Sequence, residues 1–176
     1  MYIQTERVIL RLFKEEDWEA VYAYTSQADV MHYIPEGVFS KEDAKRFVLE
    51  NKGEKARYFP IIEKSSNQLM GHLFFEPYFG THTYEIGWVM NPCYTGKGYA
   101  SEAAAAMINY GFTELGLHRI VATCQPENIA SWRIMEKIGM RKEGLFKQCI
   151  PTADGWWDEF YYAILADEYK KSRALE

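Results

Sequence analysis

The stretch 91–102, which reads NPCYTGKGYASE, holds the residues best suited to chemistry. Its pattern predicts a strand that ends just before it and a helix that begins at Tyr99. Gly96 and Gly98 permit a tight turn and let a phosphate approach the backbone N–H groups. The first helical turn adds unpaired N–H donors and the positive end of the helix dipole. The stretch therefore predicts a pyrophosphate-binding loop, and the alternative is a plain strand-to-helix turn.

Two other phosphate-binding patterns do not fit this loop. The third glycine of a dinucleotide fingerprint would fall at Ser101, and no βαβ unit with an acidic residue about 20 positions further on surrounds it. A P-loop would need Gly-Lys-Ser/Thr after a four-residue spacer, and that sequence does not occur here. A nucleotide-binding protein is therefore the weaker alternative.

Cysteine and histidine spacing predicts neither a metal site nor a disulfide framework. The residues concerned are Cys93, Cys124 and Cys149, and His32, His72, His82 and His118. No CxxC pair occurs among them, and no histidine is placed in the sequence to activate Cys93 as a nucleophile.

Length and charge limit the class of protein. A chain of 176 residues predicts one domain that spans 1–176. The net charge is −5 and no basic stripe occurs, so nucleic acid is not an expected partner. No apolar run approaches the length of a membrane span, and residues 1–7 lack a signal-peptide pattern. These features predict a cytoplasmic protein with no membrane partner. Residues 1–50 hold 10 acidic and 6 basic side chains, a balance that favours a cationic substrate or a solvated helix face.

Hydrophobic periodicity predicts the elements that must position the loop. Strands are expected at 8–12, 57–63, 68–76, 82–90, 119–124, 141–149 and 158–165. Helices are expected at 15–26, from Ser40 to about 51, at 99–115 and 130–138, and at the C-terminus. This order, β-α-α-β-β-β-α-β-α-β-β-α, predicts an α/β fold with a mixed sheet rather than a purely parallel one.

The loop also resembles a known family. Thr95-Gly96-Lys97-Gly98-Tyr99-Ala100 is similar to the [Gln/Arg]-x-x-Gly-x-[Gly/Ala] motif of the GNAT acetyltransferases, although Thr95 stands where Gln or Arg is usual. Residues 84–92 resemble the central strand of that family. The stretch 128–140, with its N-x-x-S start and K-x-G-M ending, resembles the following helix. Residues 117–120 and 161–169 are similar to the branch of the ribosomal-protein N-terminal acetyltransferases.

The resemblance covers about 5–170 and implies a mostly antiparallel central sheet, splayed at its middle strand and flanked by helices. It also implies acetyl-CoA as co-substrate, with no metal. The residues that it assigns to the cofactor are Val89, Met90, Thr95, Gly96, Lys97, Gly98, Tyr99, Ala100, Ser101, Asn128 and Ser131. Asn128 fits an ordinary helix N-cap as well.

Two residues are expected to be catalytic. Glu85 matches the strand glutamate of the family and would deprotonate the amine, directly or through a water; the alternative is a structural carboxylate. Many relatives protonate the thiolate with a tyrosine where this chain has Met135. The ribosomal branch uses a serine three residues after the asparagine, and Ser131 matches it. Tyr161, Tyr162 and solvent remain alternatives for the acid.

The expected reaction is therefore direct transfer of an acetyl group from acetyl-CoA to a primary amine. The acceptor is a peptide N-terminus, a polyamine or another small amine, among which the sequence does not choose. It leaves a homodimer open, and a non-catalytic acyl-CoA-binding module on the same fold is the alternative from another functional class.

Overall fold

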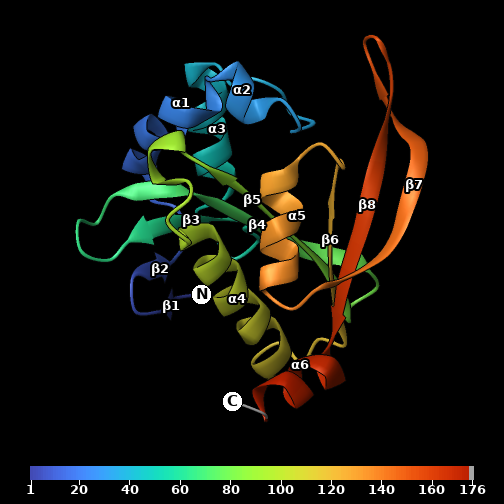
Figure 1. Cartoon of the computed structure of the whole chain (residues 1–176). Coiled ribbons are helices and arrows are strands. Elements are labelled where there is room, and N and C mark those ends of the chain that lie inside the picture. The colour runs from blue at the N-terminus through green and yellow to red at the C-terminus, as the bar shows by residue number, and fades with distance from the viewer. Residues whose placement is uncertain (175–176) are drawn as a thin grey trace. The chain divides into compact units, whose positions relative to one another are not determined.

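The computed structural model describes residues 1–174. In chain order, its elements are β1 (Ile3–Gln4), β2 (Val8–Leu10), the 3-10 helix η1 (Glu15–Asp17), α1 (Trp18–Thr25), α2 (Ala28–Met31), α3 (Lys41–Glu50), β3 (Tyr58–Glu63), β4 (Leu69–Phe79), β5 (Thr83–Met90), the 3-10 helix η2 (Pro92–Tyr94), α4 (Tyr99–Thr113), β6 (Arg119–Cys124), α5 (Ile129–Lys137), β7 (Arg141–Thr152), β8 (Gly155–Leu165) and α6 (Ala166–Arg173) (Figure 1). None of the helices in this described part is long and apolar enough to cross a membrane.

The chain divides into two compact units. The first unit comprises Met1–Phe75 and Gly87–Met107, and the second unit comprises Glu76–Ile86 and the chain from Ile108 onward. The elements β4, β5 and α4 each contribute residues to both units.

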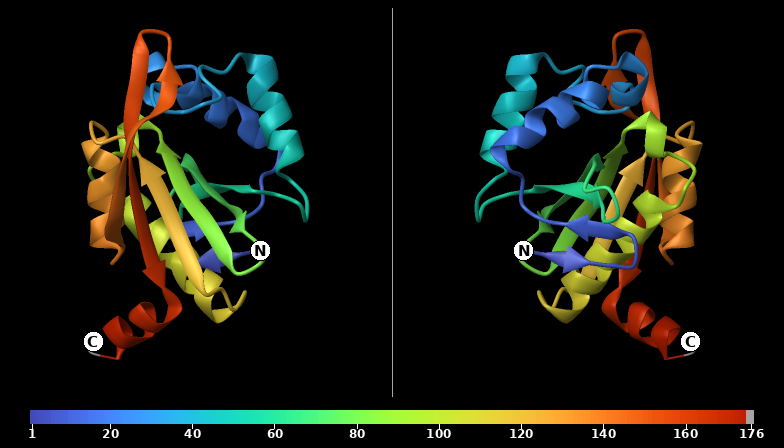
Figure 2. Two further views of the ribbon diagram at one scale, coloured as in Figure 1. Left: turned by 90° about the vertical axis from the view of Figure 1, so that its right-hand side faces the viewer. Right: turned by 90° about the vertical axis from the view of Figure 1, so that its left-hand side faces the viewer.

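Strands β1 to β3 and the start of β4 form an antiparallel meander in the first unit. Leu10 pairs with Ile61, and Ile61 pairs with Gly71. Figure 2 shows α1, α2 and α3 gathered on the same side of these strands. Val21 of α1 and Val48 of α3 are both buried against strand residues in one hydrophobic core. The removal of these side chains from water holds the helices to the strands.

The predicted start of the helix at Ser40 is confirmed. The Ser40 hydroxyl accepts from the amide of Asp43 at 3.1 Å, and the Asp43 carboxylate accepts from the amide of Ser40 at 3.0 Å. This reciprocal capping box satisfies two backbone donors that a helix would otherwise leave free.

Strands β6, β7 and β8 and the start of β5 form the sheet of the second unit. Residues Thr83–Glu85 of β5 pair in parallel with Arg119–Val121 of β6, and β6 pairs antiparallel with β8. Strands β7 and β8 form a hairpin, which is drawn in orange to red in Figure 1. A parallel pair needs a long connection, and the chain through α4 provides it. Ile120, Val121 and Ala163 are fully buried and form the centre of this core.

The expected fold class is confirmed. The eight strands follow the order β1-β2-β3-β4-β5-β6-β8-β7, and β5 with β6 is a parallel pair among antiparallel ones. The result is a mixed, mostly antiparallel sheet with helices at its sides, and the splay at the middle strand remains a prediction.

Some boundaries differ from those expected. Strand β1 has two residues and α2 has four, which is too short for periodicity to detect. Strand β7 continues to Thr152 and strand β8 already begins at Gly155, because these two residues pair across a tight hairpin turn. The expected loop at 150–157 is longer than the observed turn, although Asp154-Gly155, a pair typical of hairpin turns, lies at its end.

Candidate active site

The glycine-bearing loop lies in the first unit between the end of β5 and the start of α4 (Figure 1). At its start, the side-chain oxygen of Asn91 accepts from the amide of Cys93 at 3.1 Å. Gly96 and Gly98 follow with φ values of 73° and 83°. Residues with a Cβ adopt this left-handed region at a free-energy cost of about 1–2 kcal/mol. The shape of the loop therefore depends on these two glycines.

The backbone donors of the loop are available for an anion. The amide of Glu102 donates to the carbonyl of Gly98 at 3.0 Å, which is the first hydrogen bond of the helix. Within residues 1–174, the amides of residues 96–101 have no hydrogen-bond acceptor. Free amides at the N-terminus of a helix attract negative charge, and the helix dipole adds to this attraction. The arrangement fits a diphosphate group.

The side chains of the loop turn inward. The Thr95 hydroxyl donates to the carbonyl of Pro92 at 2.9 Å, and the Lys97 ammonium donates to the carbonyl of Cys93 at 3.1 Å. The Ser101 hydroxyl donates to the carbonyl of Gly98 at 2.9 Å. The loop therefore offers a ligand its backbone rather than its side chains. For this reason, threonine at position 95 in place of Gln or Arg is compatible with anion binding.

Near its C-terminal end, one edge of β5 lies against β4. The amide of Asn91 donates to the carbonyl of Met70 at 2.8 Å. A Cβ added at Gly71 would lie 2.3 Å from the Val89 carbonyl, so this glycine allows close approach of the two strands. The N–H and C=O groups of successive strand residues point to opposite edges of the strand. The groups of Val89 therefore point toward β4, as the amide of Asn91 does, and those of Met90 point to the opposite edge of β5. Of the two residues of β5 that are expected to bind the cofactor, Met90 is the one whose amide is directed away from β4.

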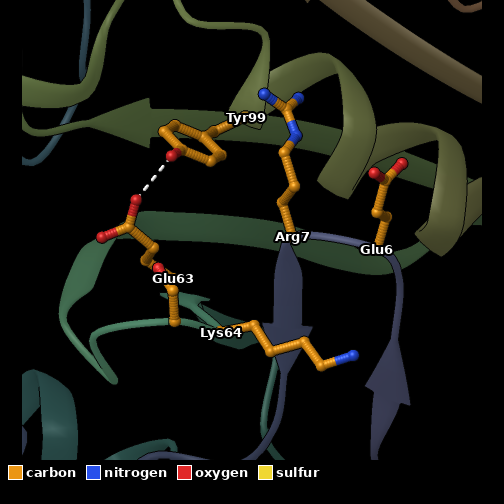
Figure 3. A pocket seen from close by; sticks show the side chains of 6 residues that line it. Glu6, Arg7, Glu63, Lys64 and Tyr99 are labelled. Carbon is orange, nitrogen blue, oxygen red and sulfur yellow. Dashed lines mark hydrogen bonds between the residues drawn. The ribbon is translucent and has the colours of Figure 1, made fainter.

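A pocket of ≈ 470 Å³ lies beside the start of α4 and is lined by Glu6, Arg7, Glu63, Lys64, Ser65 and Tyr99. In Figure 3, the Tyr99 ring lies between Arg7 and Glu63, and its hydroxyl donates to the Glu63 carboxylate. The Arg7 Nε donates to Glu102 at 2.7 Å. Hydrogen bonds from Ser66 and Tyr99 hold the pKa of Glu63 below its usual range. Glu63 thus stays ionised. The Arg7–Glu102 and Tyr99–Glu63 contacts join the first turn of α4 to the residues at β2 and β3.

The predicted base lies in the second unit, on what we term the carboxyl face. This face consists of Glu85, Thr123 and Glu159 and their neighbours on the same side of β5, β6 and β8. Glu85 pairs with Val121, and Thr123 pairs with Tyr161. Side chains two positions apart on a strand share a face, so Glu85, Thr123 and Glu159 point to the same side. The Thr123 hydroxyl donates to Glu85 Oε1 at 3.2 Å.

The pKa values of the Glu85 and Glu159 carboxyl groups are both raised above the ordinary value for glutamate. Burial raises the pKa of Glu85, a hydrogen bond from Thr123 lowers it, and the charges of Glu159 and Glu76 raise it. Burial also raises the pKa of Glu159, against a lowering by Thr123. A carboxylate with a raised pKa is a stronger base at neutral pH. The geometry therefore makes Glu85 a suitable general base.

Aromatic side chains border the two carboxyl groups. The ring centroid of Tyr161 lies 6.3 Å from that of Tyr78 and 5.8 Å from that of Phe146. Burial and the nearby Tyr161, Glu85 and Glu159 raise the pKa of Tyr78, so this phenol stays neutral. The carboxyl face thus combines negative charge with aromatic surface, which suits an organic cation.

The residues predicted to contact the thioester lie on the opposite side of the same strands. Asn128 caps α5, and its side-chain oxygen accepts from the Ser131 amide at 3.3 Å. Ser131 hydrogen-bonds the thiol of Cys124, which pairs with Phe160 and faces away from Thr123. Within this unit, Glu85 and Ser131 are therefore on opposite faces of the sheet.

The alternative acids differ in their surroundings. Tyr162 is buried and donates to Glu136 at 3.1 Å, and burial raises its pKa to about 12. Its proton is therefore held tightly. Tyr161 lies on the carboxyl face with Glu85. Met135 is buried, so the position of the usual tyrosine provides only packing.

Residues 1–174 contain no group of three or more His, Cys, Asp or Glu side chains arranged to hold a metal ion. Burial raises the pKa of Cys124 to about 11, which keeps this thiol protonated and a poor nucleophile near neutral pH.

Comparison with known proteins identifies the family. The model of the acetyltransferase (GNAT) domain matches residues 7–141. The chain belongs to the GNAT acetyltransferase family. This GNAT chain is 62% identical over 169 residues to YnaD, an uncharacterized N-acetyltransferase of Bacillus subtilis, over 96% of this chain and 99% of the relative. It is 28% identical over 151 residues to the spermidine N(1)-acetyltransferase of Escherichia coli, over 78% of this chain and 74% of the relative.

A solved structure gives the same assignment. The GNAT acetyltransferase of Bacillus anthracis is 61% identical, with a TM-score of 0.92, over 95% of this chain and 99% of that one. The matches span residues of both units and confirm the GNAT fold.

Sequence reasoning missed Thr123, Glu159 and Gly71. Thr123 and Glu159 lie 38 and 74 positions after Glu85 and meet it only through strand pairing. The alternation of side chains along a strand could have placed Glu159 on the same face as Tyr161. The register of β6 against β8, however, cannot be derived from the sequence of either strand alone. Gly71 had a local signal, since a glycine inside a strand often marks a close backbone approach.

Proposed function

We propose that this GNAT protein is an acetyl-CoA-dependent N-acetyltransferase that acts as one catalytic domain over residues 1–176. The single observation that carries the proposal is the row of unpaired amides at 96–101, at the start of a helix, in a loop that lies within the residues matched by the family model. These amides would hold the pyrophosphate of acetyl-CoA. The match of the family model across residues of both units supports one domain.

The proposed cofactor contacts follow from this placement. The amides of Gly96, Gly98 and Ser101 face the phosphates, together with those of Lys97, Tyr99 and Ala100, and the neighbouring Thr95 fixes the loop. The Met90 amide, and with it the end of β5 at Val89, binds the pantetheine arm. Asn128 and Ser131 contribute from the start of α5.

In the proposed reaction, the acceptor amine attacks the thioester directly and no acyl-enzyme forms. Glu85 removes the proton from the amine. Ser131 lies on the opposite face of the sheet, so it donates a hydrogen bond to the departing thiolate only where the predicted splay at the middle strand opens a path between the two faces. An α-amino group with a pKa near 8 costs about 1.4 kcal/mol to deprotonate at pH 7, whereas an alkyl amine near 10.4 costs roughly 4.6 kcal/mol. A base therefore contributes more to the reaction of an alkyl amine.

We propose a primary amine as acceptor. The negative and aromatic character of the carboxyl face supports a small cationic amine, such as a polyamine, and a spermidine acetyltransferase is among the more distant relatives. Residues 117–120 and 161–169 support the ribosomal branch and hence a peptide N-terminus as the second acceptor class. A homodimer is compatible with both. The free thiols of Cys93 and Cys149, both exposed, support a reducing cytoplasm.

A turnover screen tests the proposal. Purified protein and acetyl-CoA are incubated with spermidine, with simple alkyl amines and with peptides that have a free or a blocked N-terminus, and the released CoA thiol is measured. We expect release with at least one free amine and none with the blocked peptide. Tight CoA binding by calorimetry with intact acetyl-CoA across the whole panel would contradict the proposal and favour the non-catalytic acyl-CoA-binding module.

A further inference from the structure

The turn between β1 and β2 is bonded to the first turn of α4, and both belong to the first unit. Glu102 Oε1 accepts hydrogen bonds from the Thr5 hydroxyl at 2.6 Å and from the Arg7 amide at 3.0 Å. Glu102 Oε2 accepts from Nε of Arg7 at 2.7 Å and lies 2.6 Å from Nη2 of the same side chain. A planar guanidinium bonded through two of its nitrogens has a fixed orientation, so its third nitrogen also points in a defined direction.

That third nitrogen reaches the glycine-bearing loop. Nη1 of Arg7 donates to the carbonyl of Lys97 at 3.1 Å. The amide of Ser101, four residues after Lys97, would bond this carbonyl in a longer helix, but it has no acceptor within residues 1–174. In Figure 3, the Arg7 side chain runs beside the Tyr99 ring, and its guanidinium carbon lies 4.8 Å from the ring centroid. Arg7 therefore holds a loop carbonyl that the helix itself leaves unbonded.

The bond to Lys97 determines where the next amide points. The Lys97–Gly98 peptide is planar and trans, so its C=O and N–H groups point in opposite directions. Because the carbonyl is held on the side of Arg7, the Gly98 amide is directed to the other side of the loop. The carbonyl of Gly98 accepts from the amide of Glu102 at 3.0 Å. The two peptide groups that flank Gly98 are thus both held, one by Arg7 and one by the helix.

The charge of Arg7 has a second effect on this region. Glu102 lies in the first turn of α4, the turn whose free amides are available to an anion, and a lone carboxylate there would repel that anion. Burial acts to raise the pKa of Glu102, but hydrogen bonds from Thr5 and Arg7 hold it below the ordinary value. The carboxylate therefore stays ionised near neutral pH, and the guanidinium offsets its charge.

We propose that Arg7 is a positioning residue for the cofactor. It holds the Lys97 carbonyl, so that the Gly98 amide is presented to the pyrophosphate, and it offsets the charge of Glu102. This inference rests on the proposed function, because it assigns what orients the loop that would bind acetyl-CoA. Arg7 acts through the loop and not by bonding the phosphates, since each of its three guanidinium nitrogens already bonds a protein acceptor.

Calorimetric titration with CoA tests this role. Arg7→Ala should weaken CoA binding by about threefold to tenfold, as for the loss of one net hydrogen bond. Arg7→Lys keeps the charge but lacks the planar fork that reaches both acceptors, so it should weaken binding nearly as much. Wild-type affinity in Arg7→Lys would overturn the proposal, because charge alone would then account for Arg7.

Arg11→Lys is the matched control. The Arg11 guanidinium also bonds a carboxylate and a carbonyl in the first unit, but these belong to Asp17, at 2.6 and 2.9 Å, and to Leu12, at 2.8 Å. The substitution should therefore leave the Kd for CoA unchanged. Thermal melting shows that each variant is folded. A loss of CoA affinity in Arg11→Lys equal to that in Arg7→Lys would overturn the proposal, because general loosening of the unit would then explain both.

NMR relaxation reads the order of the loop without ligand or turnover. In ¹⁵N-labelled protein, the heteronuclear NOE of the Gly98 amide should fall in Arg7→Ala and Arg7→Lys and keep its wild-type value in Arg11→Lys. This result supports the positioning of the Gly98 amide by Arg7 even if the wild type binds no CoA, an outcome that counts against the proposed function alone. An unchanged NOE at Gly98 in both Arg7 variants would overturn the role of Arg7 and leave the proposed function standing.

Discussion

The loop of the first unit and the carboxyl face of the second unit recognise charge by different means. In the loop, the side chains of Thr95, Lys97 and Ser101 bond carbonyl groups of the loop itself. The Tyr99 hydroxyl bonds Glu63, and the backbone amides of residues 96–101 remain free. On the carboxyl face the backbone is paired within the sheet, and the side chains of Glu85 and Glu159 hold the charge. The loop suits a fixed anion, and the carboxyl face suits a group that loses a proton.

This difference determines how each region responds to change. Backbone amides do not titrate near neutral pH, so binding at the loop should depend on φ angles and not on pH. Burial and the charge of Glu159 raise the pKa of Glu85, so one carboxyl group alters the ionisation of the other. The following four predictions test this contrast, from the largest expected effect to the smallest.

Glu85→Gln should have the largest effect. Loss of a general base lowers the rate by about 10²–10⁴-fold, and we expect a loss of this order in kcat/KM at pH 7 with an alkyl amine. The raised pKa of Glu85 places the acid limb of the wild type above that of an ordinary glutamate, and activity falls as pH drops through it. The loss should shrink as pH rises toward the pKa of the acceptor. Profiles of kcat/KM against pH from 6 to 9, for the wild type and the variant, test this prediction. An equal loss of kcat/KM at every pH would show that Glu85 only positions the substrate.

Gly98→Asp should weaken CoA binding by roughly 100-fold, since each tenfold corresponds to 1.4 kcal/mol and both strain and charge oppose binding. The substitution places a Cβ at φ 83° and a carboxylate beside the free amides. Gly116→Asp, at φ 63° after the end of α4 and with open space around it, is the matched control for strain. Calorimetry at pH 6 and pH 8 should give the same ratio for Gly98→Asp. Equal affinity of the two variants would remove the anion site from this loop.

The strongly shifted pair in the core of the first unit should affect stability rather than turnover. Tyr24 hydrogen-bonds His72 Nδ1 at 2.6 Å, and burial lowers the pKa of His72 to about 3. A lowered pKa in the folded state means that stability is complete above the unfolded pKa of about 6.5 and is lost as pH falls toward 3. Between pH 7 and pH 5, this gives a loss of about 2 kcal/mol.

Urea unfolding at the two pH values measures that loss. The double variant Tyr24→Phe/His72→Phe removes both polar groups together, so no buried donor is left without a partner. It should lack the pH dependence due to His72. An unchanged difference between pH 7 and pH 5 would show that other groups account for it.

Ser131→Ala should have the smallest effect, about tenfold in kcat, because one hydrogen bond to a charged group contributes about 1.5–3 kcal/mol and Ser131 shares its hydroxyl with Cys124. Acetyl-CoA affinity should change little, since the hydrogen bond strengthens as charge builds on sulfur. Thermal melting of the same variant is the control. A lower Tm with normal kcat would assign Ser131 a packing role with Cys124 and leave Tyr161 or solvent as the acid.

Sequence signals within a few residues of one another predicted most of the fold and, within the candidate site, the loop and the helix cap. The capping box at Ser40, the loop glycines at 96 and 98 and the cap at Asn128 act within a few residues, and the structure confirms each conformation. Short elements such as β1 and α2 were not predicted, because two to four residues carry no period. The partner of Glu85 was not predicted either, because it depends on the pairing of β6 with β8.

The sequence by itself determined the loop, its free amides and the family, because glycine conformation and helix starts depend on neighbouring residues. Only the tertiary structure decided that Thr123 lies between Glu85 and Glu159 and that Ser131 faces the opposite side of the sheet. A shift of one residue in strand register would move every side chain of a strand to the other face. Register is set by the packing of the whole sheet, so these neighbours are a property of the fold and not of any one segment.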